Sequence, residues 1–183
     1  IGEIGVLSSG GTPSRGNYNY YNGDIPWVKS GELNYNVIKD TEEKITQEAL
    51  DFSSAKIVPA NSLLIALYGS TVGKIATLGI DASTNQAVAA IVTFPNLNQR
   101  FLYYYLLHNR EKLLQKRKGG AQPNISQKIL SEFRFPVPPL NEQNLIVFKI
   151  EELLSELDHT EKGIQKAKQQ LEVYSQTMLK NAF

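Results

Sequence analysis

The chain has 183 residues and a formal net charge of +1 at pH 7, and 42% of its residues are hydrophobic while 20% are charged. Such a chain can bury one substantial core. It has no cysteine, no apolar run of about 18 residues and no basic leader before a hydrophobic stretch, which argues against disulfides, membrane insertion and secretion. We therefore expect a cytoplasmic protein that does not enter a membrane.

Charge is unevenly distributed along the chain. Residues 32–51 hold six acidic and two basic residues, whereas residues 110–140 hold seven basic and two acidic residues. This segregation predicts a local positive field around the second segment. A solvated basic helix end without a specific partner would give the same pattern.

The N-terminal part of the chain contains a loop, residues 8–16, whose glycines and proline exclude regular structure. Residues 25–28 are typical of a short strand, and Trp27 is expected in the core. Arg15 and Lys29 lie beside flexible loops. In such positions a cation can reach a phosphate.

The strongest strand signal spans residues 62–94. Three β-rich segments, residues 63–68, 72–78 and 87–92, are separated by short polar stretches. This pattern predicts an antiparallel meander, in which each strand pairs with the next along the chain.

The turn between the first two of these segments superficially resembles a phosphate-binding loop. However, Gly69 and Gly73 are separated by three residues where four are required, and Ile75 stands where Ser or Thr should bind magnesium. We therefore exclude nucleotide binding there and expect a hairpin tip. That tip offers four side chains to a partner: Tyr68, Ser70, Thr71 and Lys74.

Helices are predicted on both sides of the strand region. Residues 46–50 favour a short helix with Thr46 as its N-cap, and residues 98–116 favour a longer aromatic helix that packs on the sheet. Ser126 is a predicted N-cap for another short helix. Residues 133–137, with alternating aromatic positions, indicate a last strand before a proline-rich stretch.

The sequence carries no sign of a catalytic or metal centre. His108 and His159 are isolated and lack ligand spacing, so neither a metal site nor a catalytic triad is expected. The Asn or Asp followed by Pro-Pro-Tyr of adenine methyltransferases is absent, as is a glycine-rich strand-loop-helix for a methyl donor. We expect no cofactor.

Residues 140–183 predict one long helix with a heptad seam. Apolar positions recur in alternating steps of four and three, as in a coiled coil. A helix of about 40 residues is roughly 60 Å long, so it should overhang its own domain and bury this seam against a second copy. The residues expected at the dimer interface are Ile146, Ile150, Leu153, Leu157, Ile164, Leu171, Tyr174 and Met178. An amphipathic helix that folds back on its own core is the alternative.

Seven short motifs are spread over almost the whole chain: Gly10-Gly11-Thr12-Pro13-Ser14, Ile25-Pro26-Trp27, Gly31-Glu32-Leu33, Gly69-Ser70-Thr71-Val72-Gly73, Thr84-Asn85-Gln86, Gly120-Ala121-Gln122-Pro123-Asn124-Ile125-Ser126 and Val137-Pro138-Pro139-Leu140-Asn141-Glu142-Gln143. In order and spacing they resemble the DNA specificity subunits of type I restriction-modification systems. The family's usual subunit carries two target recognition domains, each followed by a long helix, and the helices pair antiparallel as a spacer. This sequence has one of each and is similar to a half subunit, either natural or excised from a longer chain.

The resemblance implies an α+β fold in two parts. A β-rich target recognition domain with packed helices occupies residues 1–139, and a long coiled-coil helix occupies residues 140–183. It also implies a non-catalytic subunit that binds double-stranded DNA at a bipartite target. Methyltransferase and restriction subunits would supply the chemistry, and the C-terminal helices would pair antiparallel in a homodimer.

DNA binding requires cations for phosphates and polar side chains at base edges. Candidates on loops or element ends are Arg15, Lys29, Tyr68, Ser70, Thr71, Lys74, Arg117, Lys118, Gln122, Asn124 and Lys128. Gln86 and Asn124 could equally fix loop backbones. Two other hypotheses remain: a scaffold that binds protein or carbohydrate, and the recognition half of a fused restriction-methylation enzyme.

Overall fold

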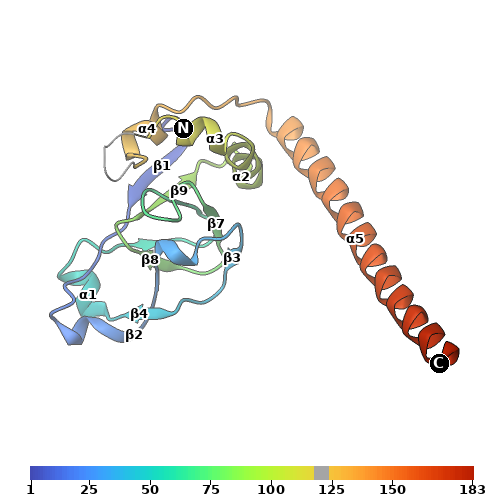
Figure 1. Ribbon diagram of the computed structural model, residues 1–183. Coiled ribbons are helices and arrows are strands. Elements are labelled where there is room, and N and C mark those ends of the chain that lie inside the picture. Colours follow the sequence, from blue (N-terminus) through green and yellow to red (C-terminus); the bar gives the residue numbers. More distant parts are fainter. Residues whose placement is uncertain (118–123) are drawn as a thin grey trace. The chain divides into compact units, whose positions relative to one another are not determined.

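The computed structural model describes residues 1–117 and 124–183 and divides into two units, Ile1–Leu140 and Asn141–Phe183 (Figure 1). The first unit contains two β-sheets with short helices, and the second is a single helix. The mixture of sheets, packed helices and a long C-terminal helix confirms the predicted α+β class. Among the helices described, none combines the length and apolar character needed to cross a bilayer.

Two mixed sheets form the first unit. The five-stranded sheet has the order β1 (Gly5–Ser9), β9 (Val88–Thr93), β6 (Leu63–Ala66), β7 (Ile75–Leu78), β3 (Val37–Ile38). The four-stranded sheet has the order β4 (Glu43–Ile45), β2 (Tyr21–Val28), β8 (Ala82–Thr84), β5 (Ile57–Val58).

The predicted meander is wrong in its strand order. β9 pairs antiparallel with β6 and not with β7, so β6 lies between its two neighbours. The segment that connects β7 to β9 contains β8, which joins the other sheet by pairing with both β2 and β5. All three residues of β8 are buried. Such burial is typical of a strand in the interior of a sheet and not of the simple turn that the meander prediction placed between β7 and β9.

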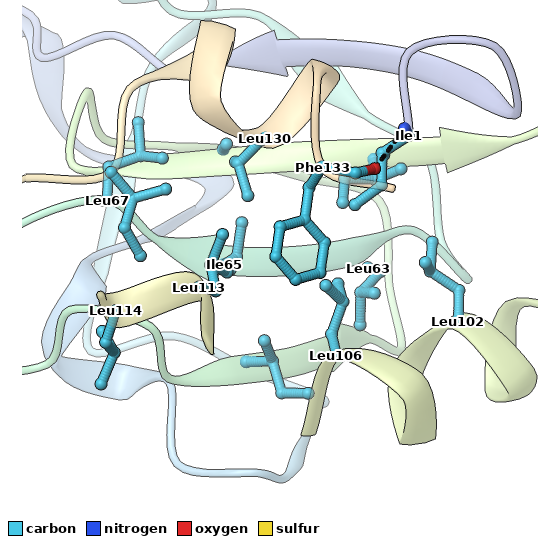
Figure 2. Packing of buried hydrophobic residues seen from close by; sticks show 14 of the residues in the cluster. Ile1, Leu63, Ile65, Leu67, Leu102, Leu106, Leu113, Leu114, Leu130 and Phe133 are labelled. Carbon is cyan, nitrogen blue, oxygen red and sulfur yellow. Dashed lines mark hydrogen bonds between the residues drawn. The ribbon is translucent and has the colours of Figure 1, made fainter. Parts of the chain in front are cut away.

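Strand alternation gives the five-stranded sheet two apolar faces. Leu63 and Ile65 face the helices α2 (Gln99–His108), α3 (Arg110–Leu114) and α4 (Gln127–Ser131), and together they form one core cluster. Figure 2 shows these side chains gathered between sheet and helices. Leu64 and Ala66 face a second cluster that includes residues of the four-stranded sheet.

The helix predictions are confirmed at their N-termini. The Thr46 side chain accepts a hydrogen bond from the Ala49 amide and caps α1 (Gln47–Asp51), as Ser126 caps α4. The helix predicted over residues 98–116 is instead two helices that meet at Asn109, whose side-chain amide donates to the Tyr105 carbonyl at 3.0 Å. Short 3-10 turns occur at Tyr18–Tyr20 and Ser30–Glu32.

The strand predicted over residues 133–137 is not present. The aromatic alternation there serves side-chain packing, because Phe133 and Phe135 both lie edge-on to Tyr105. The carbonyls accept from other groups: the Ile1 amino nitrogen donates to Phe133 O at 3.0 Å, drawn dashed in Figure 2, and the Tyr105 hydroxyl to Arg134 O at 3.0 Å. A strand needs a partner strand, which alternation alone does not supply.

Nearly all of the second unit belongs to α5 (Leu140–Ala182), a helix of 43 residues, which corresponds to about 65 Å. It confirms the predicted long helix. Ile146 and Ile150 are half-buried, and the predicted seam residues from Leu153 to Met178 are exposed, with 64% for Leu157 and 67% for Leu171. Pairing of this seam with another helix stays a prediction.

Candidate nucleic-acid interface

The turn between β6 and β7 forms a closed tip. Ala66 N donates to Lys74 O at 2.9 Å and Gly73 N to Ala66 O at 2.8 Å, so backbone bonds seal its base. Gly69 and Gly73 have φ values of +82° and +75°, a backbone conformation that strongly favours glycine. Ser70 is exposed at the tip, while Lys74 is half-buried.

Helix α3 lies directly behind the tip. A Cβ on Gly73 would come within 2.8 Å of Leu114 Cδ2, so the missing side chain allows this close approach. The Arg110 guanidinium donates to Val72 O at 3.3 Å, and Arg117 Nε donates to Leu114 O at 2.8 Å. The contacts of Arg110 and Leu114 hold α3 against the hairpin, and the basic residues Lys116 and Arg117 follow soon after its last residue.

A third segment joins the same region, because Ile125 N donates to Leu67 O at 2.8 Å. Tertiary structure therefore brings together predicted residues from three segments, which we call the hairpin surface: Tyr68, Ser70, Thr71, Lys74, Arg117 and Asn124. Tyr68 also packs against the helix-side core. Asn124 is exposed.

One further predicted residue, Lys128, lies in the described part of the chain that follows Asn124. Lys128 on α4 is highly exposed, with its Nζ 3.9 Å from Glu132 Oε1. A shallow hollow of about 390 Å³ lies nearby and is lined by Gln115, Lys116, Arg117, Ile129 and Glu132. Lys118 and Gln122 lie outside the described residues.

Arg15 and Lys29 belong to a different place, a charged cluster of Arg15, Lys29, Glu42 and Glu43. Arg15 lies 2.6 Å from Glu43, and Lys29 lies 2.9 Å from Glu43 and 2.8 Å from Glu42. The Arg15 guanidinium also stacks over Tyr21, 4.4 Å from the ring centroid. Contact of these cations with DNA stays a prediction, and each would have to exchange a glutamate for a phosphate.

The two cations lower the pKa of Glu43. The larger cause is the hydrogen bond from Arg15 and the next is the one from Lys29, while partial burial opposes both. In turn, hydrogen bonds to Glu42 and Glu43 raise the pKa of Lys29. The cluster is therefore charged on both sides at neutral pH and has no net charge.

Glu43→Gln should lower the free energy of unfolding at neutral pH by at most about 1 kcal/mol, because the pair is partly exposed. The pKa of Glu43 is lower in the folded state than the ordinary glutamate value, so its ionised form stabilises the fold. This stabilisation is complete at a pH above the ordinary glutamate pKa and is lost as the pH falls through the folded-state pKa. The difference between variant and parent should therefore vanish in acid. Urea unfolding from pH 7 downward measures it.

Asp24→Asn is the control for this prediction, since Asp24 is an exposed carboxylate on the same strand as Tyr21, and no ion pair joins it to any described residue. If Glu43→Gln lowers the free energy of unfolding by the same amount throughout the acid range, the lost stability does not come from the charge of Glu43.

The remaining motif residues hold the two sheets to the N-terminal loop. Trp27 is 1% exposed and its indole N–H donates to Gly11 O at 3.0 Å, while Gly11 N donates to Thr84 O at 2.9 Å. A hydrogen bond joins Thr12 and Gln86. This bond links the Gln86 side chain to the N-terminal loop.

One neighbour of the hairpin surface was missed from sequence. Lys74 Nζ donates to Asn34 Oδ1 at 3.0 Å, across 40 residues of chain. The polar, aromatic composition of residues 34–36 was the available signal. However, no local pattern places that loop beside the hairpin.

Comparison with known proteins gives consistent matches. A sequence model of the family described as type I restriction modification DNA specificity domain matches residues 1–172. The chain is 34% identical over 164 residues to the type I restriction enzyme EcoR124I/EcoR124II specificity subunit of Escherichia coli, covering 86% of this chain and 40% of that protein. It is 29% identical over 188 residues to the MjaIX specificity subunit of Methanocaldococcus jannaschii, covering 100% and 42%.

A solved structure shows the same fold. The HsdS subunit of Thermoanaerobacter tengcongensis superposes with a TM-score of 0.69 at 20% identity, over 88% of this chain and 38% of that chain. The chain thus spans well under half the length of each of these relatives.

Proposed function

Because this chain belongs to the family of type I restriction modification DNA specificity domains, we propose that it is a sequence-specific DNA-binding subunit, or part of one, in a type I restriction-modification complex. The match of the family over residues 1–172 is the observation that carries this proposal. The subunit selects the site, and methyltransferase and restriction subunits carry out the reactions there. The chain itself is non-catalytic.

We place DNA contact at the hairpin surface and at the basic residues that follow α3. Lys74, Lys116 and Arg117 supply positive charge there, and Ser70 and Asn124 supply exposed polar groups. Phosphates bind cations, while base edges bind short polar side chains. The charged cluster at Arg15 contributes less to affinity, because two glutamates neutralise its two cations.

Dimerisation through α5 completes the proposal. A helix with an exposed heptad seam can bury it against a copy of itself about a two-fold axis. In an antiparallel pair Ile146 lies near Met178 of the partner copy. Each copy then brings one recognition unit, so that two units read a bipartite target.

Changing Lys116, Arg117 and Lys118 together to Ala should weaken binding to random-sequence duplex DNA. For every phosphate that the variant no longer neutralises, the slope of log affinity against log salt should flatten by about 0.9, because fewer counterions are released. Titration of a labelled duplex by fluorescence anisotropy at several salt concentrations measures the slope.

The matched control removes three lysines from outer positions of the long helix: Lys162, Lys166 and Lys180, all exposed. It makes the same change in net charge but should leave the slope almost unchanged. Equal slopes for the parent and the basic-segment variant, with both folded, would remove this segment from the DNA-binding surface. If the parent chain does not bind duplex DNA in a salt-dependent way, the proposed function itself is rejected.

A further inference from the structure

The loop Asn34–Asn36, which we call the tyrosine loop, is bonded to the hairpin at three points. Tyr35 N donates to Ile75 O at 2.8 Å and Thr77 N donates to Asn36 O at 2.9 Å. The third is the bond from Lys74 to the Asn34 side chain at 3.0 Å. The loop and the hairpin surface therefore form one continuous structure.

Tyr35 has an unusual backbone for its residue type. Its φ is +61°, in the left-handed region. Among the described residues, the other non-glycine positions with positive φ are Asn22 and Asn61, and Asn tolerates this region better than other side chains. A bulky aromatic residue is strained in this region, and such strained positions cluster at ligand-binding sites.

Surrounding groups hold Tyr35 in this conformation. The Tyr103 hydroxyl on α2 donates to Tyr35 O at 3.1 Å, and the Tyr35 amide is bonded to the hairpin strand. The residue is 38% exposed despite these backbone constraints. The fold thus leaves Tyr35 partly exposed beside the hairpin surface, on the same loop that binds the Lys74 ammonium.

We infer that Tyr35 is a specificity-determining contact to a DNA groove, and that Tyr103 is a positioning residue for it. This inference rests on the proposed function and adds a second reading element to the hairpin. Lys74 contacts a phosphate, and the bond from Lys74 to Asn34 fixes the position of the tyrosine loop relative to that phosphate. The Tyr35 ring then makes apolar contact with a base edge, as other apolar groups do with the methyl group of thymine.

The test uses substitutions chosen to suit the left-handed backbone. Tyr35→Gly and Tyr35→Asn remove the ring and also relieve the conformational strain. The relief of strain offsets part of the stability that is lost with the packing of the ring. Asn61→Gly is the matched control, because Asn61 has a φ of +64° in a different turn. Tyr103→Phe keeps its ring and removes only the hydroxyl that holds the Tyr35 carbonyl.

Each variant of the native protein is expressed with the methyltransferase subunit of its own operon, in cells without other DNA methylation. Sequencing that detects methylated bases then maps the motif. Both Tyr35 variants should relax preference at one position of each half-site by roughly tenfold, typical of the removal of one base contact. Tyr103→Phe should relax the same position to a smaller extent, and Asn61→Gly should leave the motif unchanged.

The outcomes separate the inference from the function beneath it. A parent motif retained in full by both Tyr35 variants and by Tyr103→Phe overturns the inference and leaves the proposed function standing. Loss of co-purification with the methyltransferase, with unchanged DNA affinity, also overturns it, because the loop would then contact protein. If the Tyr35 variants do not fold, the motif of Tyr103→Phe decides. If the parent complex methylates no defined motif, both proposals are overturned.

Discussion

Replacing Leu153 and Leu157 together with Glu should convert dimers into monomers. Both residues lie on the heptad seam of α5 and are exposed in the single chain, by 47% and 64%. In an antiparallel pair each protomer would bury two carboxylates against apolar seam residues of the other. The dissociation constant should rise at least about a thousandfold, which is about 4 kcal/mol. Analytical ultracentrifugation of parent and variant at micromolar concentration measures this.

The same variant should lose the bipartite target. Two identical recognition units related by a two-fold axis read identical half-sites in inverted orientation, so the parent should methylate an interrupted palindrome. A helix of about 65 Å limits the half-sites to a separation of one to two turns of DNA, since one turn is roughly 34 Å. Methylation mapping after expression with the methyltransferase subunit tests both statements.

The control is Phe148→Glu with Val173→Glu, which adds the same charge outside the seam. These residues occupy outer heptad positions and are 66% and 62% exposed. This variant should remain dimeric. A monomeric parent chain at micromolar concentration, or an asymmetric motif from a native half-length protein, would refute pairing through α5.

Gly10→Ala should unfold the first unit far more readily than the parent. A Cβ at this position would overlap the carbonyl oxygen and side-chain hydroxyl of Thr84, and neither the backbone nor a fully buried side chain can move away cheaply. The expected loss in free energy of unfolding is about 3 kcal/mol. Urea denaturation followed by Trp27 fluorescence, the chain's one tryptophan, measures it.

Gly31→Ala is the matched control, because it introduces the same methyl group at another motif glycine. No heavy atom lies within 4 Å of a Cβ there. The free energy of unfolding should change by less than about 0.5 kcal/mol. A loss for Gly31→Ala as large as that for Gly10→Ala would contradict overlap with Thr84 as the cause of the Gly10→Ala effect.

Local patterns in the sequence determined the elements whose causes are local. Thr46 and Ser126 were recognised as N-caps because a cap bonds to an amide three residues away. The long helix α5 followed from a heptad period that continues through its whole length. The family resemblance also rested on motifs of three to seven neighbouring residues, and the matching family model bears it out.

Long-range pairing was decided only by the tertiary structure. Strand order depends on which neighbour buries the most apolar surface, so β6 took a central place between β7 and β9, against the meander prediction. The strand expected near Phe133 lacked a partner and became a support for Tyr105. Neither outcome is encoded within a window of a few residues.

The candidate site divides in the same way. Residue type and loop position were enough to nominate Ser70, Lys74 and Arg15 from sequence. Only the fold showed that Lys74 meets Asn34 across 40 residues, and that Arg15 meets Glu43 across 28. Charge and hydrogen bonding act over a few ångströms, so the environment of a side chain depends on which distant segments the packed core brings beside it.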